Sequence, residues 1–206
     1  MGERQAHRRG LDLAYYLGPL GAGRYTEVVD AITSGAVRSD DTYDRMNTAA
    51  ASRGLVLPAR RRDDRFLELS KGEFEGRRVG DVYSSEDLAR KDIDWDFRHS
   101  TTGETAREAG GRVREAIIEL ATRQPPVTQD SDKIPGTLVI VHNLATSHAL
   151  GLLHAGDRPA QLRAHMADNG DGHIMNVYAD GGIYLGPRLL SAVGAVCQGC
   201  VAHQQG

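Results

Sequence analysis

Apolar residues recur along the first third of the chain in patterns that predict two helices and two short strands. Residues 3–20 place their apolar positions on one face of a helix. The apolar stretch at residues 28–33 ends at a serine and a glycine and predicts a strand. A second helix is predicted over residues 42–52, stopped by Gly54, and the sequence LVLP at residues 55–58 predicts another short strand.

The clearest helical pattern covers residues 104–123, where every third or fourth residue is apolar. Thr101 and Glu104 have the spacing of a capping box, in which a hydroxyl and a carboxylate satisfy exposed backbone N–H groups at the start of a helix. The following sequence, QPPVTQDSDKIPG at residues 124–136, is polar and rich in proline. This composition does not suit a packed helix or strand, so the segment is predicted to be a linker.

An uninterrupted apolar run at residues 138–141 predicts a buried strand that ends at His142. The pattern then predicts a helix over residues 145–154 and a β-hairpin over residues 173–186, with its turn at an Asp-Gly pair. Residues 187–206 lack a clear period and predict a loosely attached tail. The globular domain is therefore expected to cover residues 1–186.

Strands that alternate with helices favour a three-layer α/β/α sandwich with a mostly parallel sheet. Ligands of such sheets bind outside the carboxyl ends of the strands. His142 follows the apolar run directly and so occupies that position. The competing interpretation is a polar residue that merely ends a strand.

Composition narrows the classes of function. The 206 residues are 40% hydrophobic and 26% charged, as expected for a globular domain, and the net charge of −3 predicts no nucleic-acid or membrane partner. No apolar run reaches the roughly 20 residues of a membrane span, and the start lacks a secretory signal, which predicts a cytoplasmic protein. Cys197 and Cys200 form a lone C-x-x-C that we interpret as incidental. No metal or cofactor is expected, because no pair among four further histidines has the spacing of a helical metal site: His148, His154, His165 and His173.

Four segments, in the same order, resemble the histidine phosphatase superfamily, the phosphoglycerate mutase-like proteins. GERQAHRRGLDLAYYL matches that family's first helix, and DDRFLELSKGEFEG its acidic loop, with Glu68 ahead of a G-x-x-x-G pattern. GETAREAGGRV matches the segment that opens a later helix, and LVIVHNL the strand that ends at the second catalytic histidine. The resemblance covers residues 2–185 and implies phosphoryl transfer through a phosphohistidine.

The resemblance also implies roles for individual residues. His142 would be the second histidine, which donates to the transferring phosphoryl group, and Glu68 the general acid that protonates the leaving alkoxide. Asn143 stands where many relatives have glycine, in the turn after the strand. The family's phosphate-binding arginine precedes a Thr-Ala pair by four residues, whereas here Arg45 precedes it by three and Asp44 takes the expected place. A shift of one residue turns a helical side chain by about 100°.

One part of the family pattern has no counterpart. The family's nucleophilic histidine lies in an Arg-His-Gly motif at the end of its first strand, upstream of the first helix. Here the sequence begins at that helix, and His7, which lies inside it, is interpreted as a solvated residue. We therefore expect the first, interior strand and the attacking histidine to be missing, and the chain to be inactive as it stands.

Three functions remain open. The first is a phosphatase or mutase whose sequence begins too late, with a longer gene product that carries Arg-His-Gly; a phosphatase is favoured, because no long basic lid segment is present. The second is a non-catalytic relative that binds a phosphorylated ligand or a protein partner, which the placement of Arg45 and Asp44 favours. The third is a remnant without activity. The expected partner in the first case is a small phosphorylated substrate.

Overall fold

The computed structural model describes residues 2–19, 21, 26–91, 93–123, 132–142, 149, 173–177 and 183–188. Helices and strands alternate through most of this range, as the apolar pattern predicted. The elements in chain order are α1 (Gly2–Leu17), β1 (Thr26–Thr33), α2 (Val37–Ala51), β2 (Arg60–Arg62), η1 (Asp64–Phe66), η2 (Gly72–Phe74), α3 (Val79–Val82), α4 (Ser85–Arg90), α5 (Ala106–Arg123), β3 (Ile134–Ile140), β4 (His173–Val177) and β5 (Ile183–Arg188).

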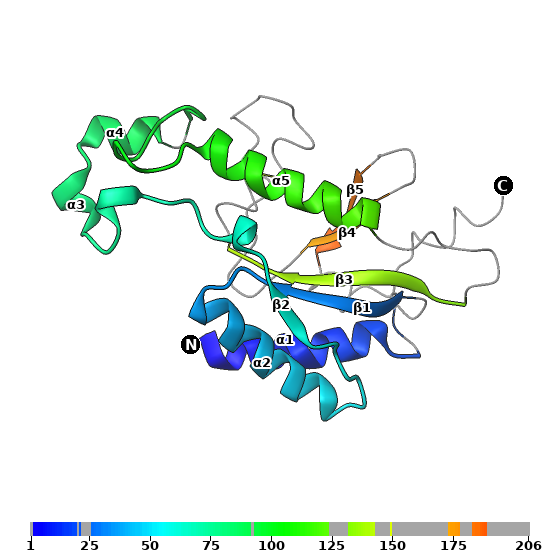
Figure 1. Cartoon of the computed structure of the whole chain (residues 1–206). Coiled ribbons are helices and arrows are strands. Elements are labelled where there is room, and N and C mark those ends of the chain that lie inside the picture. The colour runs from blue at the N-terminus through cyan, green and yellow to red at the C-terminus, as the bar shows by residue number, and fades with distance from the viewer. Residues whose placement is uncertain are drawn as a thin grey trace.

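The main sheet has the order β2-β1-β3, and both of its strand pairs are parallel. Strands β4 and β5 form a separate antiparallel pair, which confirms the predicted hairpin; its Asp180-Gly181 turn lies outside the described residues. Helices α1 and α2 lie on one face of the main sheet and α5 on the other (Figure 1). The predicted α/β fold with a mostly parallel sheet is confirmed. All three carboxyl ends of a parallel sheet meet at one edge, and that edge positions the site.

Side chains of β3 alternate between two hydrophobic clusters. Leu138 and Ile140 pack into the cluster formed with α1 and α2, whereas Val139 and Val141 pack into the cluster formed with α5. Successive side chains of a strand point to opposite faces, so an uninterrupted apolar run is the pattern of a strand buried on both faces. The strand begins at Ile134 and includes a proline, so the end of the predicted linker is part of β3.

Helix α1 packs closely on α2 at Gly10. A Cβ atom at this position would lie 2.2 Å from the backbone oxygen of Met46 and 2.8 Å from the Cβ of Ala49. Both distances are far below van der Waals contact, so only glycine allows this approach of the two helices. The close packing explains why Gly10 stands within the segment that resembles the family's first helix.

The second helix and the second strand lie at other positions than predicted. Helix α2 begins at Val37, five residues before the predicted start, after an N-cap alanine whose side chain makes no capping hydrogen bond. The second strand is Arg60–Arg62 rather than residues 55–58, because its backbone pairs with the end of β1. A short edge strand can consist of charged residues, since their side chains remain in water.

The capping box of α5 lies four residues after the predicted one. The Thr105 hydroxyl accepts from the Glu108 N–H at 3.1 Å, and the Glu108 carboxylate accepts from the Thr105 N–H at 2.9 Å. The hydroxyl of Thr101 instead donates to Glu73 at 3.0 Å. Glu104 is thereby available for contacts with the loop that carries Glu68.

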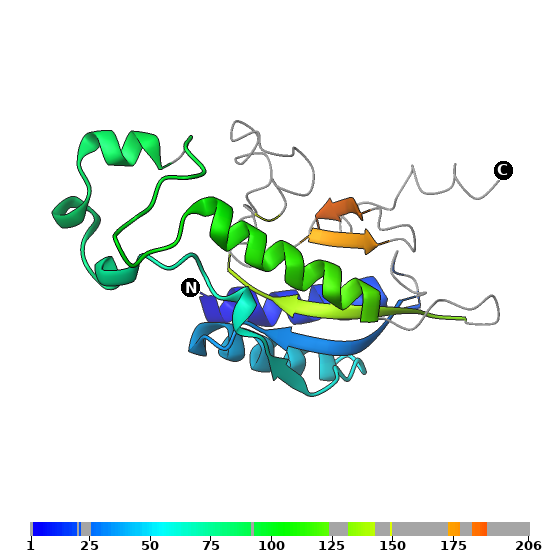
Figure 2. The ribbon, with the colours of Figure 1, turned by 45° about the horizontal axis from the view of Figure 1, so that its top comes forward.

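The segment with α3 and α4 projects beyond the carboxyl ends of the main strands (Figure 2). The predicted helix at residues 145–154 lies outside the described residues except for Ala149, as do Cys197 and Cys200. Strand β5 continues to Arg188, two residues beyond the expected domain boundary. Among the described helices, none has both the length and the apolar character needed to cross a membrane.

Candidate functional site

His142 and Ser34 meet at the carboxyl edge of the main sheet. Each lies just beyond the end of its strand, and the strand ends are in register, with Thr33 paired to Ile140. The Ser34 Oγ lies 2.7 Å from the Nε2 of His142. Both residues are buried, with exposed fractions of 0% for Ser34 and 7% for His142. The parallel pairing of β1 and β3 therefore brings together two side chains that are 108 residues apart in sequence.

Arg38 approaches the same imidazole from the first turn of α2. Its Nε donates to the Nδ1 of His142 at 3.0 Å. Arg38 is exposed, so its guanidinium remains accessible to a ligand while it contacts the buried ring. Guanidinium groups bind phosphate oxygens through several N–H donors at once, which makes this position suitable for an anion.

His142 is held neutral at pH 7. Burial lowers the pKa of its imidazole below 6.5, and the nearby charge of Arg38 lowers this pKa further, whereas the Glu68 carboxylate acts in the opposite direction. A buried imidazolium beside a guanidinium would be costly, because both desolvation and like charge disfavour it. The site thus presents one exposed cation, one neutral imidazole and one carboxylate that is close enough to influence that imidazole.

Glu68 lies in the loop that follows β2 and η1, at the same edge of the sheet. Phe66, two residues earlier, is 1% exposed and packs in the α5-side core with Val113 and Ile117. The carboxylate of Glu68 also accepts from the N–H of Leu69 at 3.0 Å. The Glu68 carboxylate is close enough to the His142 imidazole to raise its pKa.

Arg112 of α5 holds this loop in place. It donates to the carbonyl oxygens of Arg65 at 2.7 Å and Leu67 at 3.1 Å, and forms a bidentate pair with Glu104 at 3.0 and 2.8 Å. Glu104 in turn accepts from the N–H of Ser70 at 2.9 Å and donates its own N–H to the Ser70 carbonyl at 2.8 Å. The backbone is thus fixed on both sides of Glu68.

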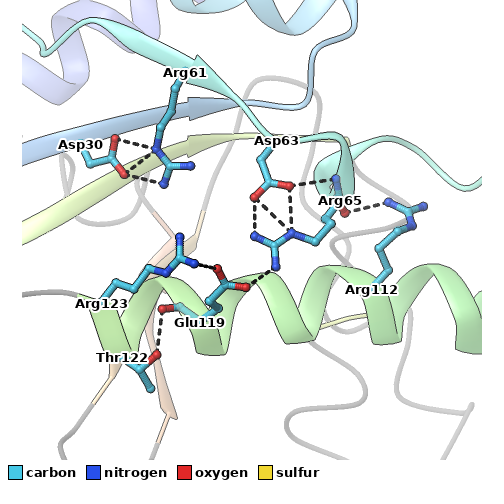
Figure 3. A network of polar contacts seen from close by, with 8 residues as sticks. All are labelled: Asp30, Arg61, Asp63, Arg65, Arg112, Glu119, Thr122 and Arg123. Atoms are coloured by element: carbon cyan, nitrogen blue, oxygen red, sulfur yellow. Dashed lines mark hydrogen bonds and ion pairs between the residues drawn. The ribbon is translucent and has the colours of Figure 1, made fainter.

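A second set of ion pairs joins the start of the loop to α5 (Figure 3). Arg65 contacts Asp63 at 2.7 Å and also Glu119, which lies 2.5 Å from Arg123. These carboxylates raise the pKa of Arg65, and Arg65 lowers that of Asp63 and of Glu119. The pairs are partly exposed, so their main effect is to fix the direction of the chain after β2.

Asp40, in α2, stabilises the turn between β1 and α2 through contacts with β1 and β2. Its buried carboxylate accepts from the Thr33 hydroxyl at 2.6 Å and pairs with Arg62 and with Arg60. The hydrogen bond from Thr33 lowers the pKa of Asp40, as do the two arginines, against the effect of burial. Thr33, directly before Ser34, is therefore tied to α2 by a buried hydrogen bond.

Arg45, which was predicted to bind phosphate, lies away from His142. Arg45 is on α2, about two turns after Arg38, and pairs with Glu3 of α1 at 2.6 Å. Asp44 pairs with Arg60 at 2.7 Å. Arg45 lines a surface pocket that does not include His142, formed by His7, Asp41, Asp44, Arg45 and Thr48. Asn143 lies outside the described residues.

Sequence reasoning missed Ser34 and Arg38. No capping residue marks the true start of α2, because the N-cap residue is Ala36. With the helix predicted to start at residue 42, Arg38 appeared to lie in a loop. In the part of the chain that the structure describes, no group of three or more His, Cys, Asp or Glu side chains could hold a metal ion.

Several solved structures share the fold over most of their length. The mycobacterial glucosyl-3-phosphoglycerate phosphatase is 17% identical, with a TM-score of 0.66, and the match covers 89% of this chain and 83% of that one. YhfR of Bacillus stearothermophilus is 15% identical, with a TM-score of 0.65 and coverage of 88% and 80%. The α-ribazole phosphatase of Shigella flexneri is 16% identical, with a TM-score of 0.60 and coverage of 87% and 79%. No match to a curated protein was found.

A family model matches residues 9–186, which include the whole of the main sheet and the residues around His142. This range also contains three of the four segments whose order suggested the same assignment, and the second half of the first, which spans residues 2–17. The chain belongs to the histidine phosphatase superfamily (branch 1).

Proposed function

We propose that this protein binds phosphomonoesters at the edge of the sheet where Ser34, Arg38, His142 and Glu68 meet. The observation that carries the proposal is the buried His142, held between Ser34 and the exposed guanidinium of Arg38, with its pKa lowered by burial and by Arg38. An exposed guanidinium supplies charge to a phosphoryl group, and a neutral imidazole supplies a directed N–H donor. The names of the related phosphatases agree with a phosphorylated small molecule as the ligand.

Hydrolysis by the route of the superfamily would need a further histidine at this site. That histidine would attack phosphorus in line while Arg38 and His142 stabilise the charge on the phosphoryl oxygens and Glu68 gives a proton to the leaving alkoxide. Water would then release phosphate from the phosphohistidine. His142 is a donor in this scheme and not the nucleophile, because its Nδ1 is engaged by Arg38 and its Nε2 by Ser34. The 206 residues contain no Arg-His-Gly motif. We therefore propose that they bind phosphomonoesters but hydrolyse them negligibly without a further histidine.

One observation favours a second candidate, a non-catalytic receptor for phosphorylated ligands. Ser34 and Arg38 already contact both nitrogens of His142, so the groups proposed to bind phosphate are assembled without any attacking group. A receptor needs only these binding groups.

Titration calorimetry with inorganic phosphate tests the binding function. The mycobacterial phosphatase has been solved in complex with inorganic phosphate, so the probe is reasonable for this fold. We expect Arg38→Met to weaken phosphate binding about 10- to 100-fold, the usual effect of losing a charge-assisted hydrogen bond. Arg45→Met, on the same helix, is the matched control and should change the affinity less than about twofold. The opposite ranking would return the phosphate-binding role to Arg45.

Hydrolysis of an aryl phosphate by the purified 206-residue chain tests the catalytic part of the proposal. We expect no rate above that of the His142→Ala variant. A rate that persists through purification and disappears in His142→Ala would contradict the proposed lack of turnover. It would place a nucleophile within these residues.

A further inference from the structure

A chain of hydroxyl groups fixes the direction of the hydrogen bond between Ser34 and His142. The Ser39 hydroxyl donates to the backbone oxygen of Ala36 at 2.7 Å. A serine hydroxyl has one hydrogen, so Ser39 must accept in its 2.9 Å contact with Ser34. Ser34 has then used its own hydrogen, and it can only accept in its 2.7 Å contact with His142. The hydrogen of the neutral imidazole therefore lies on Nε2.

The other side of the ring gives the same answer independently. Arg38 has donors and no acceptor, so the Nδ1 of His142 must accept the hydrogen from the Arg38 Nε at 3.0 Å. An imidazole whose Nδ1 accepts, and which is neutral, has its hydrogen on Nε2. Two contacts, one at each nitrogen of the ring, thus require the same tautomer.

We propose that Ser34, oriented by Ser39, is a positioning residue that holds His142 with its hydrogen on Nε2, ready to donate to a phosphoryl oxygen. The phosphoryl part of this statement rests on the proposed function. Ser34, Ser39 and His142 are 0%, 3% and 7% exposed, so water cannot easily replace any partner. The Ser34 oxygen accepts the same Nε2 hydrogen that the proposed function directs to a phosphoryl oxygen. The donor is therefore oriented before the ligand binds, which lowers the entropic cost of binding.

The same arrangement excludes a serine nucleophile. A nucleophilic Ser34 would need the Nε2 of His142 as its base, with a lone pair directed at the hydroxyl hydrogen. Here the Nε2 carries the hydrogen and the Ser34 hydrogen points to Ser39. The proximity of serine and histidine is thus a positioning contact and not a catalytic dyad.

Imidazole nitrogen NMR on the full chain tests the proposal without any assay of activity. Above pH 7, where His142 is neutral, the wild-type spectrum should show a protonated Nε2, an unprotonated Nδ1 and a slowly exchanging Nε2 proton. Ser34→Ala should speed exchange of that proton about tenfold, because it removes the buried acceptor. Ser39→Ala should have a smaller effect in the same direction. The control is Ser52→Ala, at the far end of α2, whose hydroxyl donates to Ala49.

A protonated Nδ1 in the wild-type protein would overturn the proposal, and this result requires no variant to fold. Unchanged exchange in a folded Ser34→Ala protein would overturn it as well.

Phosphate titration of the same samples separates the positioning role from the proposed binding function. If the wild-type protein fails to bind phosphate but shows the Nε2 tautomer, the binding function is wrong and the positioning role stands. If it binds phosphate with the hydrogen on Nδ1, only the positioning role is wrong.

Discussion

Replacing Arg112 by methionine should loosen the loop that carries Glu68. Methionine retains the apolar stem of the side chain but loses the guanidinium and its four hydrogen bonds, two to backbone carbonyls and two to Glu104. The side chains of Arg112 and Glu104 are 22% and 26% exposed, so solvent screens the pair only in part. Glu104 would retain its contact with the Ser70 N–H but lose its counter-charge.

The structure sets the expected magnitude. A hydrogen bond to a charged group contributes about 1.5–3 kcal/mol when buried, and partial exposure reduces the sum over the four bonds. We expect the free energy of unfolding to fall by about 2–3 kcal/mol, which corresponds to a decrease in Tm of about 4–12 °C for a domain of this size. Urea unfolding followed by circular dichroism measures the change.

A second measurement separates loss of loop position from general loss of stability. Glu68 raises the pKa of His142 in the native site, so a loop that moves away should lower that pKa further. Titration of the His142 resonances in folded Arg112→Met measures this shift. The matched control is Arg114→Met, an exposed arginine on the same helix, which should change neither quantity. A destabilisation below about 1 kcal/mol, or an unchanged His142 pKa, would refute the role assigned to Arg112.

Two further predictions concern the framework of the site. The pKa of Asp40 is lowered in the folded protein, so its contribution to stability is present above the unfolded pKa of about 3.9 and is lost as pH falls below that value. Compared with the wild-type protein, Asp40→Asn should unfold at a lower urea concentration at pH 7 and lose less stability on acidification. An unchanged dependence of stability on pH would contradict this. Gly10→Ala should destabilise the protein by about 1–3 kcal/mol, because its Cβ would overlap the backbone of Met46. The control is Gly111→Ala on α5, where a Cβ meets no atom within 4 Å; it should be neutral or stabilising by up to about 1 kcal/mol. Equal changes in Tm for the two variants would refute the close packing of α1 on α2.

The sequence by itself determined the parts of this protein that depend on local pattern. The run before His142 is apolar at every position, which is the pattern of a strand that packs on both faces, so its position at the carboxyl edge could be predicted. The regular apolar positions of α5 fixed that helix in the same way. Glu68 could be selected only through the motif around it, because an acidic residue in a polar loop has no local signal of its own.

The tertiary structure alone decided which polar residues meet His142. Helix α2 starts after Ala36, whose side chain makes no capping bond, so no sequence signal marked the start that brings Arg38 to the imidazole. Ser34 reaches His142 through the pairing of β1 with β3, which is set by backbone hydrogen bonds between segments more than 100 residues apart. Backbone pairing depends on no particular side chain. The residues that it brings together therefore become visible only once the sheet is assembled.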